Sequence, residues 1–118
     1  MNVTNGPLAP KKDIFGIYYA AYQYFGFRTK YDLDSYKQAR ASLEKAIISD
    51  PTNALIWSLL ANLFLNNHIF QFEPSDNDIE RTRDYAERAL WLDPNCQYAY
   101  EAMSWVYLLT GKRTNASK

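Results

Sequence analysis

Residues 39–64 read ARASLEKAIISDPTNALIWSLLANLF, and residues 82–107 read TRDYAERALWLDPNCQYAYEAMSWVY. A shift of 43 residues places Asp50-Pro51 on Asp93-Pro94 and a Glu-Lys-Ala-Ile run on a Glu-Arg-Ala-Leu run. The same shift places Trp57 on Tyr100, and chemically similar apolar positions follow at helical spacing. Self-similarity at a fixed period is the signature of a repeat architecture, in which each repeat is one supersecondary unit. The chain is therefore predicted to fold as stacked repeats.

Local signals predict where the helices of each repeat begin and end. Proline disfavours helical backbone in the residue before it, so helices should stop near Asp50 and Asp93. Asn53 is a suitable N-cap for the helix that follows the first Asp-Pro, and Gly111 is a suitable left-handed C-cap. The expected helices span Lys11–Gly26, Asp32–Ser49, Ala54–His68, Asp76–Leu92 and Gln97–Thr110.

These helices predict an all-α fold of stacked antiparallel helix pairs, an α-α superhelix with about two full repeats and the first helix of a third. Two helices cannot bury a core alone, whereas stacked repeats bury a continuous one. Small residues should let the backbones approach while aromatic residues fill the space between them; these are Ala46, Ala61, Ala89 and Ala102, with Trp57, Phe64, Tyr100 and Tyr107. Ordinary bundle packing without a repeat is the alternative. Residues 11–118 should form this domain, and residues 1–10 a flexible N-terminal tail.

The residues of the repeat resemble a known family. Trp57, Leu60, Ala61 and Phe64 supply a bulky aromatic, a leucine, a small residue and a second aromatic. In this order they look like the first helix of a tetratricopeptide repeat (TPR), and the resemblance extends from about Asp13 to the C-terminus. The second helix and its stop are matched by Ala39, Leu43, Ala46 and Pro51, and the next repeat by Tyr100, Met103, Ser104, Tyr107 and Gly111.

The chain departs from this family in its spacing. The family's repeat has about 34 residues, so a period of 43 implies an insertion of about nine residues. The insertion should lie between Asn66 and Asp78, and a smaller one at Phe27–Tyr31. Such enlarged loops are similar to the repeat regions of bacterial membrane-anchored winged-helix transcription activators and of class III adenylate cyclases.

The resemblance implies a non-enzymatic module that binds a protein or peptide segment. The alternative is a regulatory or sensory segment of a larger bacterial signalling or transcription regulator. In this family the first helices line a concave groove, and here Ile14–Phe25, Ala54–His68 and Gln97–Thr110 contain a single charged residue between them, Glu101, so the groove should be neutral and aromatic. The family's inward-facing positions correspond to Tyr18, Tyr22, Leu55, Ser58, Asn62, Asn66, Tyr98, Glu101, Trp105 and Leu108. A place in the core is the alternative for the aromatic ones.

Charge and reactive residues argue against other functions. Lys+Arg and Asp+Glu both number 13, so the chain offers no electrostatic reason to bind nucleic acid. Cys96 and His68 are each the only residue of their type, which disfavours a thiolate metal cluster and a nucleophile–histidine pair. We therefore expect no enzyme activity, no cofactor and no metal.

One uncharged stretch, from Ala54 to Phe72, approaches the length of a membrane span. It contains Asn62, Asn66 and His68, and polar side chains are costly in lipid. A helix buried between other helices is therefore expected instead of a span. The cytoplasm is the expected compartment, with the periplasm as the alternative if the chain is part of a membrane-anchored regulator.

Two segments should expose apolar side chains. The loop at about Asn66–Ser75 holds Ile69, Phe70 and Phe72, which either form a functional surface or fold back onto the helices. Ser75 after it begins a Ser-x-x-Asp pattern that resembles a capping box for the next helix. The last helix, Gln97–Thr110, is apolar on more than one face, so a homodimer through this helix is expected. The alternatives are a natural chain that continues past Lys118, or Lys11–Gly26 of a neighbouring molecule packed on this end.

Overall fold

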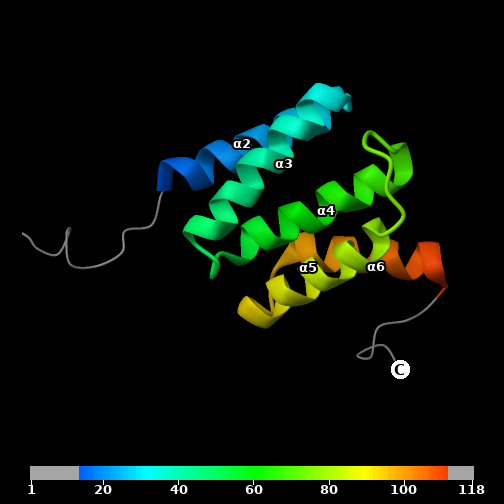
Figure 1. The fold of residues 1–118 in the computed structure, drawn as a ribbon. Helices are drawn as coiled ribbons and strands as arrows, with labels where there is room; N and C mark the ends of the chain where they lie inside the picture. The colour runs from blue at the N-terminus through cyan, green and yellow to red at the C-terminus, as the bar shows by residue number, and fades with distance from the viewer. Residues whose placement is uncertain (1–13, 112–118) are drawn as a thin grey trace, which may run out of the picture.

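The computed structural model describes residues 14–111 and is all-α over that range, as predicted. Its helices are α2 (Ile14–Lys30), α3 (Leu33–Ser49), α4 (Ala54–Phe70), α5 (Asp78–Leu92) and α6 (Gln97–Thr110). The helices form two antiparallel pairs, α2 with α3 and α4 with α5, and α6 packs against α4 and α5 (Figure 1). The predicted tail at residues 1–10, and residues 112–118 after the last helix, lie outside the described residues.

The helix ends follow the local signals closely. Asp50 and Asp93 are the C-caps of α3 and α5, and each donates its backbone N–H to a carbonyl four residues earlier, that of Ala46 or Ala89. Asn53 caps α4, because its side-chain oxygen accepts the N–H of Ile56 at 3.1 Å. Both stops and this cap confirm the prediction.

The predicted end of α6 is confirmed, whereas the predicted cap at the start of α5 is wrong. Gly111 closes α6 with a φ of +71°, a left-handed conformation that glycine adopts without steric cost. The capping box at Ser75 is wrong, because α5 begins at Asp78 with Asn77 as its N-cap and without a side-chain capping bond. The Ser75 hydroxyl bonds to the Asn77 side chain instead, at 2.8 Å.

The 43-residue register recurs in the hydrogen bonds. Trp57 donates its indole N–H to the carbonyl of Pro51 at 2.7 Å. At the matched positions, Tyr100 donates its hydroxyl to the carbonyl of Pro94 at 2.8 Å. In both places an aromatic side chain on the first helix reaches back across the turn and fixes the Asp-Pro connection. The repeat is thus present in the interactions as well as in the sequence.

Helix α4 lies between the α2/α3 pair and the α5/α6 helices, and it is the most buried of the helices described (Figure 1). On one side its Phe64 joins a cluster with Tyr24, Phe27 and Tyr36 from the first pair. On the other side Ala61 meets α5 and α6, where alanines allow close approach; these are Ala86, Ala89, Ala99 and Ala102. This position explains why α4 carries no charge. None of the helices within residues 14–111 is long and apolar enough to cross a membrane.

The smaller predicted insertion, at Phe27–Tyr31, is wrong. Helix α2 continues to Lys30, Phe27 is fully buried on it, and the chain turns at Tyr31 with a φ of +51°. The connection expected between Asn66 and Asp78 begins later than predicted. Helix α4 continues to Phe70, so the connection to α5 spans only residues 71–77.

Candidate functional site

The first helices of the pairs, α2, α4 and α6, pack side by side, with α4 in contact with both of the others. A cavity of about 210 Å³ opens between them at the end where α2 finishes. It is lined by Arg28, Tyr31, Asn62, Leu65, Asn66, Ile69, Phe70, Glu101 and Trp105. The predicted groove residues Asn62, Asn66, Glu101 and Trp105 therefore meet at one place.

The other predicted groove residues lie outside this cavity. Tyr18 and Tyr22 are 71% and 72% exposed and line a shallow hollow with Phe15 and Tyr19 near the start of α2. Leu55 and Leu108 are exposed, whereas Tyr98 is half-buried with its ring 5.9 Å from that of Phe25.

Ser58 is fully buried, and its hydroxyl donates to the Leu55 carbonyl at 2.6 Å. Its side chain therefore does not reach the surface that a partner would contact. Ser58 supports the packing of α4 against its neighbours instead of lining the groove.

Two asparagines form the floor of the cavity. The side-chain amide of Asn62 donates to the carbonyls of Ser58 and Tyr98, both at 2.9 Å, and so ties α4 to α6. Asn66 donates to the Asn62 carbonyl at 2.8 Å. Within the described residues the side-chain oxygens of both asparagines accept no hydrogen bond. The floor therefore offers two acceptors to a ligand.

Arg28 forms one wall and was not predicted. Its Nε donates to the Tyr31 hydroxyl at 2.6 Å and its Nη1 to the Tyr24 hydroxyl at 3.1 Å. Burial raises the pKa of Tyr24 to about 12, although the bond from Arg28 opposes this shift, so the phenol is neutral at ordinary pH. The hydrogen bond with Tyr24 raises the pKa of Arg28, which therefore stays charged.

The expected first helix stopped at Gly26, and for this reason Arg28 was not counted among the groove's charges. The expectation that Glu101 is the single charge on the first helices is wrong, because α2 also carries Arg28 and Lys30. Asp32, whose side chain caps α3 at 2.8 Å, marks where α3 begins and not where α2 ends, so it gave no signal for Arg28.

Phe70, the last residue of α4, lines the cavity together with Arg28. The ring of Phe70 lies 5.4 Å from those of Tyr31 and Phe72. Phe72 folds back onto the core, where it stacks on Tyr36 at 5.5 Å. Of the apolar run, Phe72 is thus a packing residue, while Ile69 and Phe70 remain about half exposed at the cavity.

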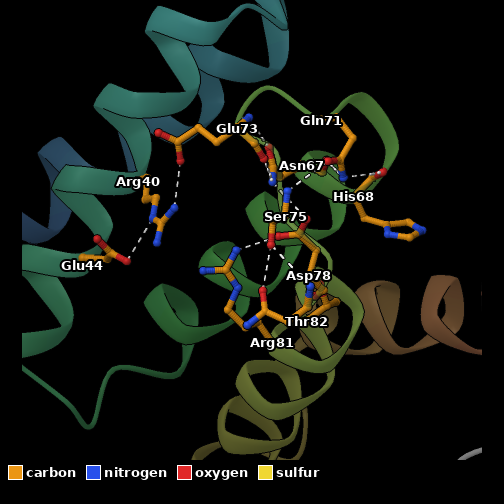
Figure 2. Close-up of polar contacts among 11 residues, drawn as sticks. Arg40, Glu44, Asn67, His68, Gln71, Glu73, Ser75, Asp78, Arg81 and Thr82 are labelled. Carbon is orange, nitrogen blue, oxygen red and sulfur yellow. Dashed lines mark hydrogen bonds and ion pairs between the residues drawn. The ribbon is translucent and has the colours of Figure 1, made fainter.

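A buried amide holds this connection in place. Asn67 is fully buried, and its side-chain oxygen accepts the N–H of Glu73 at 2.9 Å. Its Nδ2 donates to the Glu73 carbonyl at 2.8 Å and to the buried Asp78 carboxylate at 3.0 Å (Figure 2). The Asn67 side chain on α4 is therefore bonded both to the connection, at Glu73, and to the first residue of α5, Asp78.

Glu73 and Asp78, the two residues bonded to Asn67, also form ion pairs with arginines on α3 and α5. Arg81 bonds to Asp78 at 2.7 Å, and its guanidinium lies 3.9 Å from the centre of the Phe64 ring. Arg40 on α3 bonds to Glu73 at 2.9 Å and so joins the connection to the first pair (Figure 2). Together the bonds of Asn67 and the ion pair of Glu73 fix the backbone of the α4–α5 connection, which holds Phe72 and follows Phe70.

The one histidine and the one cysteine of the chain do not line the cavity. His68 is exposed, and its ring points away from the polar cluster in Figure 2. Over the described residues no three His, Cys, Asp or Glu side chains are grouped so that they could hold a metal ion. Comparisons with protein-family models, curated proteins and solved structures found no match.

Proposed function

We propose that this chain is a non-enzymatic module that binds a protein or peptide segment along its first helices. The observation that carries the proposal is the cavity of about 210 Å³ to which α2, α4 and α6 all contribute side chains. Sites for small molecules usually enclose about 300–1,000 Å³. A cavity below that range suits one or two side chains of a longer ligand that continues across the surface.

The surface on either side of the cavity supports such a ligand. Tyr18 and Tyr22 leave their rings exposed along α2, and Leu108 leaves its apolar side chain exposed on α6. Contiguous exposed apolar groups mark interaction sites, and tyrosine and tryptophan are enriched where proteins bind one another. Because the cavity is built on packed helices, little ordering is needed on binding.

We also propose that the chain is a tetratricopeptide repeat protein with an enlarged connection inside the second repeat. Antiparallel pairing, the 43-residue register and the shared contact from Trp57 and Tyr100 to the Asp-Pro turns support this assignment. The extra length would be residues 71–77, which follow Phe70, the last residue of α4 and part of the cavity lining.

A display experiment tests the proposed function. A phage library of random dodecapeptides is panned against the immobilised protein, and the best binder is synthesised with an amidated C-terminus and a fluorescent label. Its Kd is measured by fluorescence anisotropy for the wild-type protein, for Trp105→Ala and for the matched control Trp91→Ala. Both tryptophans are exposed, but Trp91 lies on α5 outside the cavity.

We expect Trp105→Ala to weaken binding about tenfold or more, because a tryptophan that a ligand covers is a typical hot spot, and Trp91→Ala to leave the Kd unchanged. A library that yields no binder, or equal losses for the two variants, would contradict the proposal.

A further inference from the structure

Two opposite charges face the same cavity without neutralising each other. Arg28 stands on α2 and Glu101 on α6, and both line the cavity above the α4 floor. Neither is part of an ion pair within residues 14–111. The two groups are nevertheless near one another, since the Glu101 carboxylate adds to the effect of burial in raising the pKa of Tyr24, the residue to which Arg28 donates.

Arg28 is held where it is by neutral partners. Tyr24 and Tyr31 accept from its Nη1 and Nε, so the guanidinium is fixed without losing its charge. Its Nη2 donates to no group in the described part of the chain. A pre-oriented guanidinium with a free amino group is suited to a carboxylate, since charge-assisted hydrogen bonds are about twice as strong as neutral ones.

The pair of charges selects among ligands. A purely acidic segment would be attracted by Arg28 and repelled by Glu101. A purely basic segment would be attracted by Glu101 and repelled by Arg28. An uncharged segment would cover both groups and leave them without partners, which is unfavourable for buried charges. Only a ligand with both an acidic and a basic group can form a favourable charge interaction with Arg28 and with Glu101.

We infer that the cavity binds a peptide segment with two opposite charges, whose basic side chain pairs with Glu101 and whose acidic side chain pairs with Arg28. An apolar side chain between them packs against Phe70 and Trp105, which line the same cavity. This inference rests on the proposed function and specifies the chemistry of the partner.

The display binders test the inference directly. Enriched sequences should carry one Lys or Arg and one Asp or Glu on either side of an apolar residue. Glu101→Gln and Arg28→Gln should each weaken the amidated binder about two- to fivefold, the range of ion pairs at partly exposed sites. Matched controls are Glu87→Gln and Lys37→Gln, which remove exposed charges on α5 and α3 away from the cavity and should leave the Kd unchanged.

Charge exchange gives the sharper result. The Glu101→Arg variant should bind the selected peptide much more weakly than the wild-type protein does. It should bind more tightly to a peptide in which the basic residue is replaced by Glu. Arg28→Lys retains the charge and should retain most of the acidic preference, while circular dichroism confirms that each variant folds. Raising the salt concentration to about 0.5 M should reduce the effects of both charges, because exposed pairs are screened.

The outcomes separate the two proposals. Binders whose sequences lack paired opposite charges, or whose Kd is indifferent to both substitutions, would overturn this inference and leave the proposed function standing. Binding only to peptides with a free C-terminal carboxylate would also overturn it. A library without any binder would overturn both.

Discussion

Asn67→Ala should destabilise the protein far more than the same change at its neighbour Asn66. The Asn67 side chain is fully buried and makes three hydrogen bonds, to the backbone N–H and carbonyl of Glu73 and to the Asp78 carboxylate. Alanine would leave all three groups without that partner. A buried polar group that loses its partner costs about 1–3 kcal/mol.

The expected loss follows from how accessible each orphaned group is. Glu73 is half-buried, so water can reach its backbone, and we assign about 1 kcal/mol to its two groups together. Asp78 is 1% exposed and keeps only Arg81 as a side-chain partner, so it contributes about 1–2 kcal/mol. The total is about 2–3 kcal/mol, a large share of the ~5–15 kcal/mol that stabilises an ordinary domain.

Asn66 is the matched control. Its amide makes one bond, to the Asn62 carbonyl on the same helix, and its oxygen faces the cavity. Because alanine is the better helix former, Asn66→Ala should change the free energy of unfolding by less than about 0.5 kcal/mol.

Urea unfolding followed by circular dichroism measures both variants. Hydrogen exchange adds a local readout, since the Glu73 amide should lose its protection in Asn67→Ala. A loss below about 1 kcal/mol, or one equal to that of Asn66→Ala, would refute the view that this amide holds the connection.

Three further expectations concern other parts of the molecule. Trp57→Ala should cost about 2–3 kcal/mol in urea unfolding, below the ~3–5 kcal/mol of a fully buried aromatic because this ring is half-buried against Tyr85; a loss under about 1 kcal/mol would contradict its role between the helices. Tyr24 has its pKa raised from about 10 to about 12, so the unfolded chain loses this proton first and stability should fall as pH rises from about 10 to 12, whereas Tyr24→Phe should show a shallower fall. Leu109, Leu108 and Trp105 leave apolar surface exposed on α6, so light scattering at tens of micromolar should show self-association that Leu109→Glu reduces, and a monomeric wild-type protein would contradict this.

The helix boundaries could be predicted because their signals act over a few residues. A helix end is set by a hydrogen bond or a backbone angle within four residues of the cap at Asp50, Asp93, Asn53 and Gly111. Such local chemistry is the same in any tertiary surrounding. The prediction erred at Phe27–Tyr31, where α2 continues to Lys30 and Phe27 packs against Tyr24 and Tyr36, because local signals do not encode such contacts.

The sequence by itself determined that residues 14–111 form an all-α fold, where most of its helices end, and which positions repeat at 43 residues. The tertiary structure decided which faces are buried. Helix α4 is apolar on nearly every side, so its own periodicity could not distinguish the buried Ser58 from Asn66 at the cavity. The cavity depends on contacts between distant residues, such as the bond from Asn62 to the Tyr98 carbonyl, 36 positions along the chain. Local propensities do not encode such contacts, because they form only when α2, α4 and α6 are packed together.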